Sequence, residues 1–179
     1  MSRLEVFDES DGKTALLDTR DGGRIAAELA GVNVRYARWA TREIGSVDIL
    51  TAYAPEITRL KAEGGYRSVD TITVTPRHPD RANLRLKFLS EHTHDEDEVR
   101  FFVAGEGLFS LHADGRVYNV LCTQGDLISV PAGMRHWFDM GPSPSFTAIR
   151  LFRNTDGWIA RFTGDTIADR FPRHQPTLA

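Results

Sequence analysis

The chain of 179 residues contains a single cysteine, which excludes an internal disulfide and CxxC metal motifs. Its 22 basic and 25 acidic side chains nearly balance, at a formal net charge of -3, and no basic stripe marks a nucleic-acid surface. Acidic residues such as Glu5 and Asp8 stand where a signal peptide needs an apolar run, and no apolar stretch is long enough to cross a bilayer. We therefore expect a cytoplasmic protein that binds neither nucleic acid nor membrane.

Length and composition predict one folded domain. Domains average roughly 150 residues, and 41% hydrophobic with 26% charged residues excludes wholesale disorder. Within this single domain, 1–179, we expect a mixed helical segment over 1–69, a β-barrel core over 70–155 and an extension over 156–179. Nothing in the sequence requires more than one copy, so we expect a monomer.

Three helices are expected in the N-terminal segment. The run over 21–31 ends at a glycine, as helices commonly do. A short helix is expected over 47–53. The run over 55–64 is a clearer one, because its proline suits a first turn and a glycine pair follows its last turn.

From about Ser68 the hydrophobic pattern changes to the period of two that is typical of strands. Asp114-Gly115 lies between two apolar runs, which is a strong hairpin signal. Short strands with such turns predict an antiparallel sandwich or barrel. The expected strands cover 69–74, 83–89, 98–103, the hairpin of 107–120, 126–130, 135–138 and 146–152. The polar tail over 172–179 is expected to be poorly ordered.

Two histidines, His92 and His94, are two residues apart, so on a strand they share one face. Glu98 has the same parity, and the alternating run over 83–89 would place all three on the buried face. Buried imidazoles and a carboxylate are costly unless they bind something, and a divalent metal would satisfy them. The alternative is a solvated acidic loop in which the histidines are incidental.

A second segment, 125–136, reads as a strand, a proline-glycine turn and then His136 at the start of the next strand. A turn of this kind can return the chain beside an earlier strand. It could therefore bring His136 to the first histidine pair.

These two segments resemble the two motifs of the cupin superfamily. The first motif, HxHxxxE followed by glycine, corresponds to His92, His94, Glu98 and Gly105, and the second, GxxxxxPxGxxH, to Gly125, Pro131, Gly133 and His136. The chain departs from the pattern at Leu86 and Met140, neither of which is a ligand position. The resemblance implies a mainly β fold, a cupin double-stranded β-helix (jelly-roll) barrel, here with an N-terminal mixed helical segment.

A finer similarity is to the acireductone dioxygenase family of the methionine salvage pathway. It is carried by 91–102, 130–138, 148–152 and 156–162. The resemblance implies one Fe2+ or Ni2+ per chain, held by His92, His94, Glu98 and His136. It also implies an O2-dependent cleavage of 1,2-dihydroxy-3-keto-5-methylthiopentene. The iron form yields formate and 2-keto-4-methylthiobutyrate, and the nickel form yields methylthiopropionate, formate and carbon monoxide.

The resemblance assigns further roles. Arg100 has the parity of Glu98 and would stabilise the substrate dianion, although a buried arginine could instead pair with Glu98. Phe102 and Phe138 would line the substrate pocket, or serve as core aromatics. The resemblance gives Glu91 a role in metal incorporation and Asp97 one in relaying local conformational change. By parity alone, both acids are expected to be solvated.

Other interpretations stay open. The chain could be another cupin oxygenase or a sugar-phosphate isomerase, although no basic phosphate cluster accompanies the motifs. It could also be a non-catalytic cupin that binds small molecules. Three histidines are expected to be incidental, namely His78 in a loop, His112 at a hairpin surface and His174 in the tail, and Cys122 is expected to be a buried structural thiol.

Overall fold

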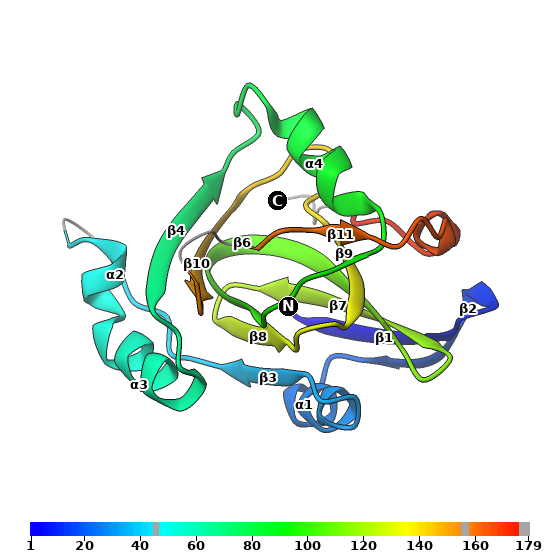
Figure 1. The fold of residues 1–179 in the computed structure, drawn as a ribbon, viewed down its shortest axis with the longest axis horizontal. Coiled ribbons are helices and arrows are strands. Elements are labelled where there is room, and N and C mark those ends of the chain that lie inside the picture. The colour runs from blue at the N-terminus through cyan, green and yellow to red at the C-terminus, as the bar shows by residue number, and fades with distance from the viewer. Residues whose placement is uncertain (45–46, 155–157, 176–179) are drawn as a thin grey trace.

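The fold is taken from a computed structural model, which describes residues 1–44, 47–154 and 158–175 (Figure 1). Within those ranges the strands are β1 (Arg3–Asp8), β2 (Asp11–Thr19), β3 (Arg35–Arg38), β4 (Ser68–Val74), β5 (His92–Thr93), β6 (Glu98–Ala113), β7 (Arg116–Thr123), β8 (Asp126–Val130), β9 (Arg135–Asp139), β10 (Phe146–Phe152) and β11 (Arg161–Phe162). The helices are α1 (Gly22–Ala30), α2 (Ile49–Ala52), α3 (Ala54–Gly64), α4 (Arg81–Leu89) and the 3-10 helix η1 (Ile167–Arg170).

Strand β6 joins the two halves of the barrel. Its first part, up to Gly105, pairs with β8 and β10, and its second part, from Glu106, pairs with β7 and β9. The strand turns at Gly105, whose φ is 74°. A side chain there is excluded, because a Cβ would lie 1.8 Å from the carbonyl oxygen of Ser145. This antiparallel arrangement closes into the predicted cupin barrel, so the predicted fold class is confirmed.

The N-terminal residues contribute strands as well as helices. Strand β1 pairs with β2 and β7, and β3 pairs with β8, so these segments extend the barrel sheets. The sequence interpretation did not include these strands. The three helices lie where they were predicted, outside the sheets (Figure 1). Asp21 caps α1 by accepting a hydrogen bond from the Arg24 amide at 2.6 Å, and Gly65 ends α3 in the left-handed region.

The main core lies between the sheets. It includes Phe102, Phe109, Phe138 and Phe146, whose rings contact one another with centroid distances of 4.8–6.5 Å. Cys122 lies in the same cluster and is fully buried, as expected. Every residue from Glu98 to Val103 is buried, so both faces of β6 are covered at its start.

The strand predicted over 83–89 is wrong, because these residues form helix α4. Leu84 and Phe88, four residues apart, face the core from one side of the helix, whereas Leu86 is 66% exposed. The alternation of apolar residues fits both periods over so short a run, and the packing of α4 against β9 decides between them. Figure 1 shows α4 lying beside the rim of the barrel.

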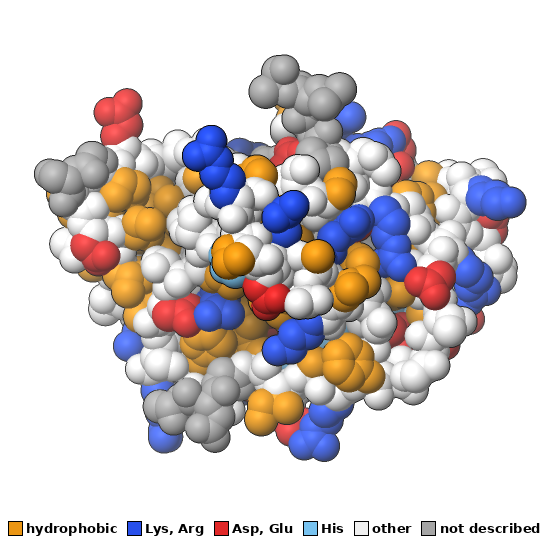
Figure 2. Space-filling model, turned by 90° about the horizontal axis from the view of Figure 1, so that it is seen from above, with side chains coloured by type: hydrophobic (Ala, Val, Ile, Leu, Met, Phe, Trp, Pro, Cys, Tyr) orange, Lys and Arg blue, Asp and Glu red, His pale blue; other side chains and the backbone are white. Residues whose placement is uncertain are grey.

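The tail is better packed than predicted over the residues that the structure describes. His174 is 4% exposed, and its amide donates to the Asp139 carboxylate at 3.0 Å. The rest of the predicted disordered tail, 176–179, lies outside the described residues. Among the described helices, none is long and apolar enough to cross a membrane. On the face shown in Figure 2, basic, acidic and hydrophobic side chains are interspersed.

Candidate metal centre

Four potential metal ligands come together inside the barrel. One donor atom each from His92, His94, Glu98 and His136 lies within 4.8 Å of the others, and all four residues are at most 4% exposed. Their elements explain the convergence: His92 on β5 pairs directly with His136 on β9, and Glu98 begins the neighbouring strand β6. These are the four residues that the cupin resemblance selected. The interpretation of an exposed loop with incidental histidines is wrong, because the residues are buried.

A turn glycine connects the two sequence motifs. The amide of Gly133 donates a hydrogen bond to the carbonyl oxygen of His94 at 2.9 Å, and its φ is 78°. The proline-glycine turn therefore holds the segment before β9 against the segment after β5. This contact positions His136 opposite the first histidine pair.

Each histidine ring is oriented by a backbone carbonyl. The Nδ1 atoms of His92, His94 and His136 lie 2.8, 2.9 and 2.8 Å from carbonyl oxygens of Ser90, Ile159 and Met134. A carbonyl oxygen only accepts, so each neutral ring carries its proton on Nδ1 and keeps a lone pair on Nε2. This tautomer is the one that presents Nε2 to a metal.

The Nε2 lone pairs converge on a carboxylate. Nε2 of His94 and Nε2 of His136 each lie 3.0 Å from Oε2 of Glu98. Neutral imidazoles would direct lone pairs at a negatively charged oxygen, which is unfavourable unless a cation lies among them. A divalent first-row metal meets this requirement, and its preference for imidazole and carboxylate ligands fits the donor set.

The protonation equilibria are shifted by burial and by mutual contacts. Burial, together with nearby His136, lowers the pKa of His92 to about 4. Burial also opposes the charged form of His94, but the Glu98 carboxylate outweighs it and raises the pKa of His94. Burial alone would raise the pKa of Glu98; Arg100 and the two histidines instead hold it well below its usual value. Glu98 is therefore a carboxylate at neutral pH.

Arg100 lies beside the four donors. Its Nε is 2.8 Å from Oε1 of Glu98, with both side chains at most 4% exposed, so the expected alternative of pairing with Glu98 is found. The guanidinium also stacks over the ring of Phe138 at 4.6 Å and over that of Trp158 at 5.3 Å. The guanidinium of Arg100 therefore lies between the Glu98 carboxylate and the two aromatic rings.

A cavity of about 430 Å³ opens onto this group, with His94 and Arg100 in its wall. The remaining lining residues are Ser68, Val69, Asp70, Lys87, Phe88, Arg150, Phe152 and Trp158. Three cationic side chains against one carboxylate favour an anionic ligand. The aromatic rings suit an apolar substituent, and the volume suits a small molecule.

Sequence reasoning missed most of this wall. Phe88 and Lys87 were placed on a strand. Arg150, Phe152 and Trp158 received no individual role, although they lie in segments 148–152 and 156–162 that resemble the acireductone dioxygenase family, which was the available signal. Phe102 and Phe138 lie in the buried core, with Phe138 directly beneath Arg100.

Glu91 and His112 depart from expectation. Glu91 was expected to be solvated, but its side chain is fully buried and accepts hydrogen bonds from His112 and from Thr163. His112 is 5% exposed rather than a surface residue. The alternation along one strand could not predict this contact, because Glu91 precedes β5 whereas His112 lies on β6, and β9 lies between these two strands.

Asp97 was also expected to be solvated, but its side chain is only 19% exposed. It accepts hydrogen bonds from the Tyr66 hydroxyl and the Ala132 amide, and it pairs with Arg153 at 2.7 Å. Its carbonyl oxygen accepts from the indole of Trp158 at 3.2 Å. Asp97 thus connects the loop between the ligands to the cavity wall.

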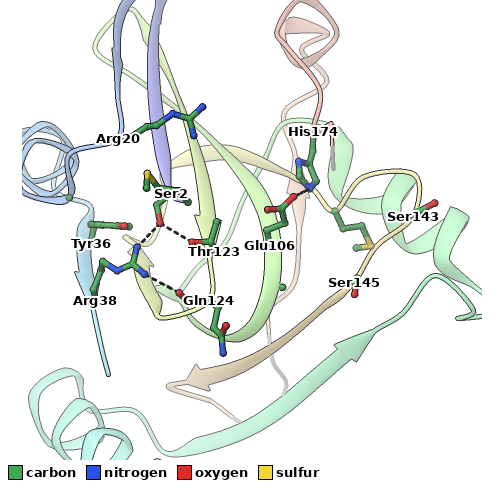
Figure 3. Close-up of a pocket in the computed structure, with 14 residues that line it drawn as sticks. Ser2, Arg20, Tyr36, Arg38, Glu106, Thr123, Gln124, Ser143, Ser145 and His174 are labelled. Atoms are coloured by element: carbon green, nitrogen blue, oxygen red, sulfur yellow. Dashed lines mark hydrogen bonds and ion pairs between the residues drawn. The ribbon is translucent and has the colours of Figure 1, made fainter. Parts of the chain in front are cut away.

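A larger cavity of about 840 Å³ lies elsewhere (Figure 3). Its wall includes Glu106, which follows Arg100 by six residues on β6, on the order of 20 Å along a strand. Figure 3 shows several of its polar groups paired with one another: Arg38 donates to Ser2 Oγ at 2.8 Å, and His174 lies 3.6 Å from Glu106. The smaller cavity, not this one, adjoins the metal ligands.

Comparison with known proteins shows the family of the chain. The chain matches the ARD/ARD' family over residues 6–160. It is 53% identical to an acireductone dioxygenase of Parvibaculum lavamentivorans over 98% of both chains. It is 56% identical to one of Parasynechococcus marenigrum, covering 97% of this chain and 99% of that one. A solved acireductone dioxygenase from Bacillus anthracis, with a cadmium ion in its active centre, superposes with a TM-score of 0.79 at 28% identity, covering 90% of this chain and 98% of that one.

The fold and the buried donor set define a cupin with a metal site of nitrogen and oxygen ligands. The match over most of the chain and the identity to full-length relatives narrow this class further. The chain belongs to the ARD/ARD' family, the acireductone dioxygenases.

Proposed function

We propose that this chain is a metal-dependent acireductone dioxygenase of methionine salvage. Its substrates would be 1,2-dihydroxy-3-keto-5-methylthiopentene and O2. The observation that carries the proposal is the convergence of three Nε2 atoms and one carboxylate beside a cationic, aromatic-walled cavity. Family membership and the names of the full-length relatives support the same activity.

His92, His94, Glu98 and His136 would hold one Fe2+ or Ni2+ ion. The carbonyl partners of the three Nδ1 atoms keep the rings in the tautomer that this role requires. When bound, the metal would supply Lewis acidity toward the oxygens of a chelating enediol. Both ions suit mixed imidazole and carboxylate ligation.

Arg100 would stabilise the negative charge of the substrate dianion. It lines the cavity, is buried, and is fixed by Glu98 and by stacking on Phe138. A charge held in a site without bulk water acts more strongly than in solvent. The same pairing with Glu98 would keep the guanidinium in place before substrate enters.

The aromatic side chains would bind the methylthio end of the substrate and exclude water. Phe88, Phe152 and Trp158 line the cavity directly. Phe102 and Phe138, which the resemblance placed in the pocket, would support this wall from the core.

Two acidic residues would assist the site indirectly. Glu91 precedes the ligand His92 and would serve metal incorporation. Asp97 contacts both the Ala132 turn and Trp158, and it would relay changes in the ligand loop to the cavity wall.

The test is oxygen uptake with acireductone after removal of metal and separate reconstitution with Fe2+ and Ni2+. The iron protein should give formate and 2-keto-4-methylthiobutyrate. The nickel protein should give methylthiopropionate, formate and carbon monoxide. A metal-free protein with full activity would contradict the proposal. The monomeric state and the cytoplasmic location remain predictions, of which light scattering tests the first and cell fractionation the second.

A further inference from the structure

A chain of hydrogen bonds crosses the outside of the sheet that carries His92 and His136. His112 on β6 places Nδ1 2.6 Å from Glu91 and Nε2 2.9 Å from Glu9. Glu91 in turn accepts from the hydroxyl of Thr163 at 2.8 Å. These four residues, the outer chain, connect the turn after β1, strand β6, the start of β5 and the end of β11.

The pairing of the strands places the outer chain on the face opposite to the metal ligands. On β6, Leu111 is paired with His136, whereas His112 is paired with the exposed Arg135. Paired residues point to the same face, and neighbours along a strand alternate. His112 therefore lies behind the ligands and does not compete for the metal.

His112 is held between two carboxylates. Its Nδ1 faces Glu91 and its Nε2 faces Glu9, so the ring bridges a buried acid and an exposed one. The side chain of Glu91 is fully buried and that of His112 is 3% exposed, whereas Glu9 is 49% exposed. A buried carboxylate without its partner is costly, so Glu91 depends on His112.

Glu91 holds the part of the sheet that carries His92. Besides the hydroxyl contact, its carbonyl oxygen accepts from the Thr163 amide at 3.1 Å, which continues the pairing of β5 with β11. In that pairing Phe162 lies opposite His92, with ring centroids 5.8 Å apart. Strand β5 is only two residues long, so few other ladder bonds fix it.

We infer that His112 is a positioning residue for the metal centre, acting through Glu91 on the short strand that carries His92. This inference rests on the proposed metal site. According to this inference, His112 does not contact the metal but influences the affinity of the site for it. Removing a partner that is hydrogen-bonded directly to a metal ligand typically weakens metal binding by about 10–100-fold. His112 acts one residue further from the ligand, through Glu91, so we expect a loss at the lower end of this range.

The test measures Co2+ affinity of the full-length apoprotein by competition with a chelator, together with the visible Co2+ spectrum. His112→Leu should weaken affinity about tenfold and change the spectrum. In His112→Asn the amide nitrogen replaces Nδ1 toward Glu91, so affinity should largely return. In His112→Gln the nitrogen replaces Nε2 toward Glu9, so affinity should stay low.

The Asn and Gln variants keep the test decisive if His112→Leu does not fold. A matched control is Ser110→Ala, on the same strand as His112. This change removes the buried 2.6 Å contact of Ser110 to Asn119 on β7 and should leave Co2+ affinity unchanged. Folded His112 variants that all bind Co2+ as the wild type does would overturn the inference. Co2+ binding needs no acireductone, so a wild type that binds metal but lacks turnover would contradict only the proposed function.

Discussion

His92 and His136, 44 residues apart in the sequence, are directly paired across β5 and β9, with ring centroids 4.5 Å apart. This pairing converts two separate motifs into one metal centre. The Gly133 turn fixes the return of the chain, and the carbonyl contacts of Nδ1 fix the rings. The consequences can be tested residue by residue.

Replacement of His136 by alanine should remove a metal ligand without unfolding the chain. The loss of affinity should exceed the roughly 10–100-fold that an outer partner contributes. Metal content after dialysis measures the effect, and circular dichroism checks the fold. His78→Ala, in the loop before α4, is the matched control and should retain full metal content. An unchanged metal content in His136→Ala would mean that another residue is the fourth ligand.

Arg100→Gln should retain metal but lose turnover. Removing one preorganised charge that acts on developing negative charge costs on the order of 10²–10³ in rate. Arg100→Lys keeps the charge but lacks the planar guanidinium, whose Nε lies 2.8 Å from Glu98, so it should recover activity only in part. Steady-state kinetics with a parallel metal analysis separates the two effects. Wild-type turnover in Arg100→Gln would exclude this residue from the mechanism.

Phe88→Ala should raise KM for the methylthio substrate, because the ring lines the cavity. Loss of an apolar contact of this kind costs roughly 10–200-fold in kcat/KM. Leu86→Ala is the matched control, since Leu86 lies on the same helix, is 66% exposed and is not part of the cavity wall. Equal kinetics in the two variants would contradict the assignment of Phe88 to the substrate pocket.

Asp139→Asn should destabilise the protein in a pH-dependent way. Its carboxylate accepts from Arg85 at 2.7 and 3.0 Å and from the amides of Gly141 and His174. Burial opposes the charged form, but these contacts outweigh it and lower the pKa of Asp139.

A lowered folded-state pKa means that the stabilisation is present above the unfolded value of about 3.9 and is lost as pH falls through the folded value. Urea unfolding should show a deficit of about 2–3 kcal/mol for Asp139→Asn at pH 7. The deficit should shrink below about pH 4. A deficit of the same size at pH 7 and at pH 3 would contradict the ionic origin of the effect.

Local pattern was sufficient for most of the barrel. Strand signals and turn residues located β6 to β10, although β6 was predicted as two pieces, 98–103 and the first half of the 107–120 hairpin. It failed over 83–89, where Leu84 and Phe88, four residues apart, fit both periods and contact with β9 favours α4. In the N-terminal segment, β2 was missed because it is exposed along most of its length and carries a weak pattern.

The metal ligands were predictable from the spacing of residues in the sequence. The contacts between distant segments were not. The two motifs contain the four predicted metal ligands. The contact of Glu91 with His112, in contrast, joins residues 21 apart, one just before β5 and one on β6. His174 and Trp158 come to the barrel from the C-terminal residues, whose course no local pattern defines. The alternation of side chains predicts which residues of one strand share a face. It does not predict how several strands and loops pack against one another, on which these contacts depend.

The most direct test of the central claim is product analysis after metal exchange. Apoprotein reconstituted with one equivalent of Fe2+ should consume O2 with acireductone and release formate and 2-keto-4-methylthiobutyrate without carbon monoxide. The same protein with one equivalent of Ni2+ should release carbon monoxide. Absence of O2 consumption with either metal, in protein shown to bind it at the four-residue site, would contradict the account.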